Sequence, residues 1–140
     1  MNTSSRFTVA IHILTLLAYE GGQMTSEYIA GSVNTNPVVI RRLLALLREA
    51  RLVSSQPGAG GGWQLTRPPK GITLRDIYRA VEEGTLFPLH SNTPNPQCPV
   101  GRNIQRVLGG HFEAAQLALD KDLERTTIAD LVQETQTLVG

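Results

Sequence analysis

Several side chains that can form more than one hydrogen bond stand close together in the first half of this 140-residue chain. Asn36, Arg41 and Arg42 share one short segment, and Thr25 and Ser26 precede it. A guanidinium binds two acceptors in its plane, and a carboxamide both donates and accepts. Hydroxyl groups at the start of a helix suit phosphate. These residue types recognise planar polar groups and anions, so they indicate a recognition surface.

A thiol is the second group that could do chemistry. Cys98 directly precedes Pro99, so we expect it at the N-cap of a helix, where the helix dipole stabilises a thiolate. Arg102, one turn further on, would add to this effect. One interpretation is a redox or electrophile sensor that forms a mixed disulfide or a bridge across a dimer. The other is a half-buried small residue without a signalling role.

Catalysis by this thiol would require a neighbouring base, for which His90 and His111 are the candidates. No paired carboxylates or metal-ligand spacing accompany them. The glycines of residues 58–62 lack the Lys-Ser/Thr pair that follows them in a phosphate-binding loop. We therefore expect a protein that is not an enzyme and has no metal site.

The polar segment requires helices to position it. We expect a first helix over residues 5–20 and a second, capped by Thr25 or Ser26, over residues 26–33. Asn36 is a good cap for a third helix that ends near residue 50, and proline suits its first position. The apolar stripe of this third helix leaves a second set of residues on its other faces: Val38, Arg41, Arg42, Ala45, Arg48 and Glu49.

A change of pattern follows the third helix. Residues 52–55 and 63–66 read as short strands joined by a glycine-rich turn, which predicts a β-hairpin. Thr73 and Asp76 form a capping-box variant at the start of a fourth helix that ends near residue 84. We expect an irregular arm over residues 87–99, then a long helix to about residue 122, and a final helix capped by Thr127 with Asp130.

Charge is distributed unevenly along the chain, although the formal net charge is only +1. Residues 1–75 carry eight lysines and arginines against three acids, a net of +5, whereas residues 76–140 carry five against nine, a net of −4. The first part therefore suits a polyanion. No apolar run reaches the length of a membrane span, and a single cysteine excludes an internal disulfide. We expect a cytoplasmic protein without membrane contact.

Two short helices, a tight turn, an arginine-bearing helix and a glycine-tipped hairpin follow the order of a winged helix-turn-helix. In that architecture the second helix of the motif enters the major groove of double-stranded DNA, where arginine and asparagine read base edges. We therefore predict a mainly α fold with a small β-hairpin wing. The alternative is a winged-helix adaptor that binds proteins and not DNA. The expected DNA-facing residues are Thr25, Ser26, Asn36, Val38, Arg41, Arg42, Gly60 and Gly61.

Motifs along most of the chain point to one family. They are Val53-Ser54-Ser55, Gly58-Ala59-Gly60-Gly61-Gly62-Trp63-Gln64-Leu65, Ile72-Thr73-Leu74-Arg75-Asp76-Ile77 and Arg79-Ala80-Val81-Glu82. Together they closely resemble the Rrf2 (IscR-like) family of bacterial winged-helix transcription regulators. Residues 33–39 and 95–101 are most similar to the YwnA-like branch of that family.

The resemblance implies a homodimeric, sequence-specific transcription regulator whose recognition helices and wings address a palindromic operator. We expect it to repress by occluding a promoter. On this basis residues 1–84 form the DNA-binding domain, and residues 85–140 form a loop and C-terminal dimerisation helices. The residues of the long helix expected to pair across the dimer are Ile104, Val107, Leu108, Phe112 and Ala115.

The sequence departs from the family pattern at two places. Members that hold an iron-sulfur cluster carry three cysteines around the loop before the long helix, whereas this chain has only Cys98, so we expect no such cofactor. Cluster-type relatives often place an arginine for the minor groove near the wing tip, where this chain has Pro57.

Overall fold

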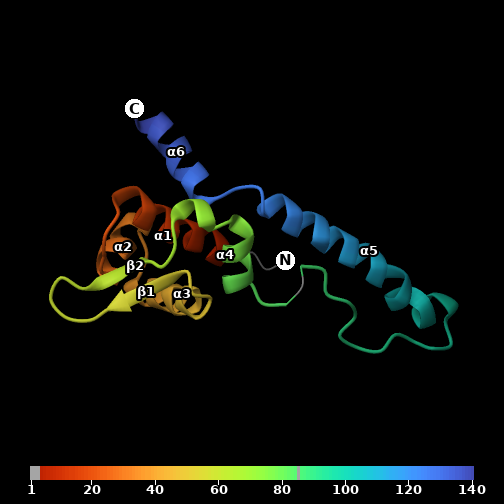
Figure 1. Ribbon diagram of the computed structural model, residues 1–140. Helices are drawn as coiled ribbons and strands as arrows, with labels where there is room; N and C mark the ends of the chain where they lie inside the picture. The colour runs from red at the N-terminus through yellow and green to blue at the C-terminus, as the bar shows by residue number, and fades with distance from the viewer. Residues whose placement is uncertain (1–3, 85) are drawn as a thin grey trace.

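The computed structural model describes residues 4–84 and 86–140. The described residues are mainly helical with one two-stranded hairpin, which confirms the expected winged helix-turn-helix architecture (Figure 1). The first three helices are α1 (Arg6–Glu20), α2 (Ser26–Val33) and α3 (Pro37–Glu49).

Short-range hydrogen bonds explain where α2 and α3 begin. The Thr25 hydroxyl oxygen accepts from the Tyr28 backbone N–H at 3.1 Å, and the Asn36 carboxamide oxygen accepts from the Val38 N–H at 2.8 Å. Asn34 ends α2 in the left-handed conformation, with φ 62°, which asparagine adopts more readily than most residues. The result is a tight turn that places α3 immediately after α2.

The hairpin consists of β1 (Val53–Gln56) and β2 (Gly62–Leu65), which pair antiparallel with Val53 opposite Leu65. We call β1, β2 and the turn of residues 57–61 the wing. Met24, just before α2, exchanges two backbone hydrogen bonds with Trp63 of β2, at 3.0 and 2.8 Å. The wing is therefore attached to the loop that leads into the helix-turn-helix.

A short 3-10 turn, η1 (Pro69–Gly71), leads into α4 (Leu74–Val81). The Thr73 hydroxyl oxygen accepts from the Asp76 N–H at 3.1 Å, and the Asp76 carboxylate accepts from the Thr73 N–H at 3.0 Å, so the predicted capping box is present. One hydrophobic core joins these elements, and its fully buried side chains include Ile13, Leu14, Ile29, Ile40, Leu44, Leu47, Leu52, Ile72 and Ile77.

The long helix α5 (Pro99–Leu123) projects away from this core (Figure 1). It contains no buried residue in this single chain. The irregular arm of residues 86–98 precedes it, as expected, and Phe87 of the arm stacks on Phe112 of α5 with ring centroids 5.3 Å apart. The surface of α5 that faces away from the core is therefore not packed against the core of its own chain.

The last helix, α6 (Ile128–Val139), returns to the core and packs against α1. The Ile128 side chain is fully buried, and its backbone N–H donates to the Ile72 carbonyl at 2.9 Å. The domain boundary predicted from the sequence, at residue 84, places α6 with the dimerisation helices. Because its first turn completes the core around α1, α6 belongs by packing with the N-terminal elements. Among the described residues, no helix has both the length and the hydropathy needed to cross a membrane.

Candidate nucleic-acid interface

The N-terminal half of α3 carries the predicted reading residues on its solvent face. Asn36, Val38, Arg41 and Arg42 are all exposed. The opposite face of the helix buries four residues of the core, Ile40, Leu43, Leu44 and Leu47. The helical period therefore separates a packed face from a polar face, as the apolar stripe predicted.

Arg41 is not isolated on this face. Its Nη2 atom lies 2.8 Å from Oε1 of Glu27, in the first turn of α2. Both side chains face solvent, with relative exposures of 51% for Arg41 and 63% for Glu27. The backbone N–H of Glu27 lowers the pKa of its carboxyl most, and the hydrogen bond from Arg41 lowers that pKa further. The candidate interface thus contains an anion paired with a predicted base-reading cation.

Glu27 was not among the residues expected at this interface. An acid in the first turn of a helix is commonly explained by the helix dipole alone. Its partner stands fourteen positions away on another helix, so no short-range spacing indicated the contact. The angle at which α2 packs on α3 decides this pairing.

The start of α2 offers a hydroxyl and backbone donors. Thr25 is exposed. Ser26, in contrast, is only 8% exposed, and its hydroxyl donates to Oε2 of Glu27 at 3.3 Å. A buried side chain cannot reach a phosphate, so the Ser26 hydroxyl does not fit the role that the sequence suggested for it. A phosphate here would meet Thr25 and the backbone N–H groups of the first turn.

The wing tip is exposed backbone. Gly60 is exposed with φ 77°, a conformation that favours glycine. A Cβ atom at Gly61 would overlap the carbonyl oxygen of Gln56. Both glycines of the predicted site are therefore required by the turn itself, and they let a ligand approach the main chain closely.

Side chains at the base of the wing hold it against the helix-turn-helix. Nε2 of Gln23 donates to Oε1 of Gln56 at 2.6 Å and of Gln64 at 3.3 Å. The Arg48 guanidinium on α3 lies over the Trp63 ring, 5.4 Å from its centroid. Helix α3 and the wing are thus linked directly.

Cys98 occupies the predicted N-cap of α5. Its Sγ atom accepts a weak hydrogen bond from the Gly101 backbone N–H at 3.5 Å, and the residue is exposed. Among residues 4–84 and 86–140, no three His, Cys, Asp or Glu side chains gather closely enough to hold a metal ion.

The predicted dimerisation residues differ in exposure. Val107 and Ala115 are exposed, whereas Ile104, Leu108 and Phe112 are half-buried. The arm of the same chain covers part of this face, because Pro88, Leu89 and His90 line a small hollow with Leu108 and Phe112. Two further apolar side chains, which the sequence analysis did not single out, stand out from α5: Val100 at 66% and Leu117 at 52% exposure.

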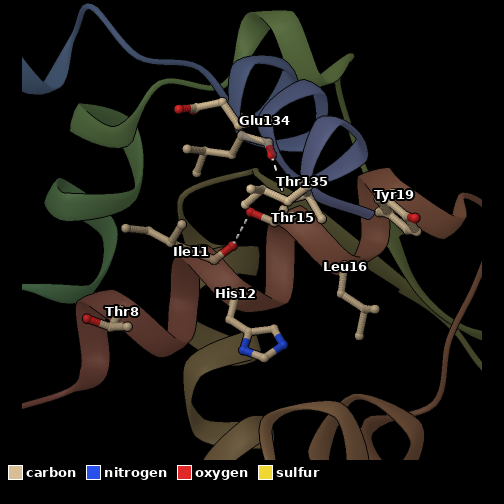
Figure 2. Close-up of a pocket in the computed structure, with 10 residues that line it drawn as sticks. Thr8, Ile11, His12, Thr15, Leu16, Tyr19, Glu134 and Thr135 are labelled. Carbon is tan, nitrogen blue, oxygen red and sulfur yellow. Dashed lines mark hydrogen bonds between the residues drawn. The ribbon is translucent and has the colours of Figure 1, made fainter. Parts of the chain in front are cut away.

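An open groove lies between α1 and α6 (Figure 2). Its volume is about 580 Å³, and its lining includes Ile11, Leu16, Leu131 and Leu138. Threonines of both helices contribute hydroxyls that bond to the main chain of their own helix, as Thr15 does to the Ile11 carbonyl at 2.7 Å. The lining includes none of the predicted DNA-facing residues, so this groove is separate from the α3 face.

Similar proteins match this sequence over nearly its whole length. The Rrf2 family profile, described as an iron-dependent transcriptional regulator, matches residues 3–134. The chain is 44% identical over 130 residues to YwnA of Bacillus subtilis, named as an HTH-type transcriptional regulator, and the alignment covers 92% of this chain and 96% of YwnA.

Solved structures show the same fold. A candidate DNA-binding protein with 41% identity superposes with a TM-score of 0.74 and covers 91% of this chain and 98% of its own. CymR of Bacillus subtilis, described as the global cysteine regulator of that organism, has 25% identity and a TM-score of 0.69, covering 96% of this chain and 98% of CymR.

The iron in the family description finds no matching donor set among the described residues. Cys98 supplies one exposed thiol, and no cluster of His, Cys, Asp or Glu side chains accompanies it there. Iron-sulfur clusters require several thiolate or imidazole ligands. The residues of this chain do not fit such a group.

Proposed function

The chain belongs to the Rrf2 family of helix-turn-helix transcriptional regulators, and from this membership we propose that it binds a palindromic DNA operator as a homodimer. The family is one of DNA-binding regulators and not of enzymes, which leaves the adaptor alternative without support. The observation that carries the proposal is the solvent face of α3, where Val38, Arg41 and Arg42 are all exposed. Action on DNA implies a cytoplasmic location.

Each part of this surface has a role in the proposed complex. Arg41 and Arg42 read base edges in the major groove, and the Val38 methyl groups can contact thymine. Asn36 holds the start of α3 through its cap and contributes polar contacts. Thr25 and the main chain of Gly60 and Gly61 approach phosphates, which fix the orientation of the protein without reading sequence.

The apolar surface of α5 supports the proposed dimer. Val100, Val107 and Leu117 are more than half exposed in one chain, and such a surface on a helix without a buried residue calls for a partner. A second copy packed there would place two α3 helices on one duplex. Two symmetry-related α3 helices match a palindromic operator with half-sites about one helical turn apart.

Binding that overlaps a promoter would make the protein a repressor. We would test the proposal by titrating the protein into a labelled duplex from the region upstream of its own gene and measuring fluorescence anisotropy at several salt concentrations. Specific binding with an affinity that falls steeply with salt is the expected result. Operator affinity should fall by about 1 to 3 kcal/mol in Arg41→Ala or Arg42→Ala if either makes a bidentate base contact.

Cys98 is proposed as a redox-responsive group of this regulator. It is exposed at the N-cap of α5, next to the apolar surface proposed for the dimer. Oxidation to a mixed disulfide or an intersubunit bridge would alter the dimer and, through it, the spacing of its two α3 helices. The same titration with a thiol oxidant tests this role. The operator affinity of Cys98→Ser should not respond to the oxidant. If the oxidant left the operator affinity of the parent protein unchanged as well, a redox role for Cys98 would be excluded.

A further inference from the structure

We propose that Glu27 determines the specificity of DNA reading, because its carboxylate holds the Arg41 guanidinium in position for a guanine edge. This inference rests on the proposed function. It adds an acidic side chain in the first turn of α2 to a proposed DNA-binding surface composed of Thr25, the solvent face of α3 and the wing.

Both oxygens of the Glu27 carboxylate accept hydrogen bonds. Oε1 accepts from Nη2 of Arg41 at 2.8 Å, and Oε2 accepts from the Ser26 hydroxyl at 3.3 Å. The backbone N–H of Glu27 lowers the pKa of this carboxyl and so favours its charged form. Anions are favoured at a helix N-terminus, so the first turn of α2 holds the carboxylate while the carboxylate holds the guanidinium.

The contact leaves Arg41 able to read a base. A guanidinium has five N–H donors, and Glu27 engages only one nitrogen of Arg41. A bidentate contact to O6 and N7 of guanine needs two further donors. Fixing the guanidinium before binding reduces the conformational freedom that an arginine side chain loses when it forms that contact.

The negative charge of Glu27 adds a second effect. Thr25, two residues earlier, is proposed to approach phosphate, so a carboxylate nearby disfavours close approach of the DNA backbone. An Arg41 already paired with an anion is also a weaker general phosphate contact. Glu27 therefore weakens phosphate contacts on every duplex while it favours one base, and the second effect raises the ratio of specific to non-specific binding.

The test begins by selecting bound sequences from a randomised duplex library with the parent protein and with Arg41→Ala. The operator position whose guanine preference is lost in Arg41→Ala identifies the base that Arg41 reads. Anisotropy then gives the dissociation constants for the consensus duplex and for the same duplex changed at that position. Their ratio measures discrimination, which for one bidentate contact is roughly 5- to 150-fold.

Glu27→Ala should lower this discrimination ratio by about two- to tenfold, with unchanged or tighter binding to an unrelated duplex. Glu27→Gln keeps an acceptor oxygen without the charge, so it should retain more of the discrimination than alanine does. In the Arg41→Ala background, Glu27→Ala should leave the ratio unchanged, since Glu27 acts through Arg41. A purely structural role would instead lower affinity for all duplexes equally.

The matched control is Glu20→Gln, which removes the same charge from an exposed carboxylate bonded to the Tyr28 hydroxyl at 2.6 Å. It should leave discrimination unchanged, and thermal unfolding should verify that every variant is folded. An unaltered discrimination ratio in Glu27→Ala, or an equal change in Glu20→Gln, would overturn the role of Glu27. The proposed function would stand in either case. A consensus without any position that depends on Arg41 would also overturn it. A selection that yields no consensus would overturn the proposed function as well.

Discussion

The Arg48 guanidinium lies over the face of Trp63, 5.4 Å from the ring centroid, and joins the recognition helix to the wing. The backbone of the same tryptophan pairs with Met24 at the start of the helix-turn-helix. Trp63 therefore contacts both the helix proposed to read bases and the loop that leads into α2. The wing and α3 are oriented relative to each other by this residue.

Removal of the cation should weaken this link. Arg48→Ala is expected to lower the free energy of unfolding by about 0.5 to 1 kcal/mol, the range for an exposed cation–π contact. Operator affinity should fall as well, because the wing is held less firmly. Urea denaturation and anisotropy measure the two effects. Arg42→Ala, on the same helix, should affect DNA binding without affecting stability, and equal stability losses in both variants would argue against a role for the Trp63 contact.

A charge on the exposed surface of α5 should prevent dimerisation. Val107 is 56% exposed in one chain, so Val107→Glu should leave the fold of each chain intact while it places an unpaired charge in the proposed dimer interface, which is costly. We expect monomers by analytical ultracentrifugation and much weaker operator binding. Arg106→Glu introduces the same side chain at the neighbouring position and should dimerise. A Val107→Glu protein that still sedimented as a dimer would place the interface elsewhere.

Arg51 follows the C-cap of α3 and adopts the left-handed backbone conformation, with φ 63°. This conformation costs an L-residue roughly 1 to 2 kcal/mol. Glycine adopts it without that cost but loses more conformational entropy on folding, which offsets part of the gain. Arg51→Gly should therefore stabilise the protein by about 0.5 to 1 kcal/mol, measured as an increased urea midpoint at constant m-value.

The same substitution tests whether Arg51 contacts phosphate. If it does, Arg51→Gly should weaken binding to all duplexes alike and reduce the slope of log Kd against log salt by about one. Arg51→Ala should share the DNA defect without the gain in stability, since alanine keeps the strained conformation. Unchanged salt dependence in both variants would show that the arginine lies outside the DNA contact surface.

The Glu27 carboxyl should titrate below its ordinary value of 4.5, chiefly because its own backbone N–H bonds to it and secondly because Arg41 does. A folded pKa below the unfolded one stabilises the protein above the unfolded pKa, and this contribution is lost as the pH falls through the folded pKa. NMR titration should show that Arg41→Ala raises the Glu27 pKa without restoring it fully. A full return to the ordinary value would mean that the N–H contact is absent.

Short-range signals were sufficient for most helix boundaries. Asn36 with Pro37 marked the start of α3, and Thr73 with Asp76 marked the start of α4, because capping bonds join residues only two or three positions apart. The glycines of the turn likewise indicated the wing. Cys98 stands at the N-cap of α5, where its position before a proline placed it.

The composition of the site was predictable in part. Helical periodicity placed Val38, Arg41 and Arg42 on a solvent face, because the core face of an amphipathic helix is visible in its sequence. The period did not distinguish Thr25 from Ser26, adjacent residues of which one is exposed and the other is buried beneath Glu27. That difference depends on how α2 packs.

The sequence by itself determined the elements, their order and the polar face of α3, since these depend on propensities, caps and periodicity over a few residues. Only the tertiary structure decided that Arg41 meets Glu27, that Phe87 stacks on Phe112, and that α6 packs on α1 while α5 extends outward. Such contacts join residues far apart in the chain. Their geometry follows from the crossing angles of packed helices and from the path of the arm, which no local pattern encodes.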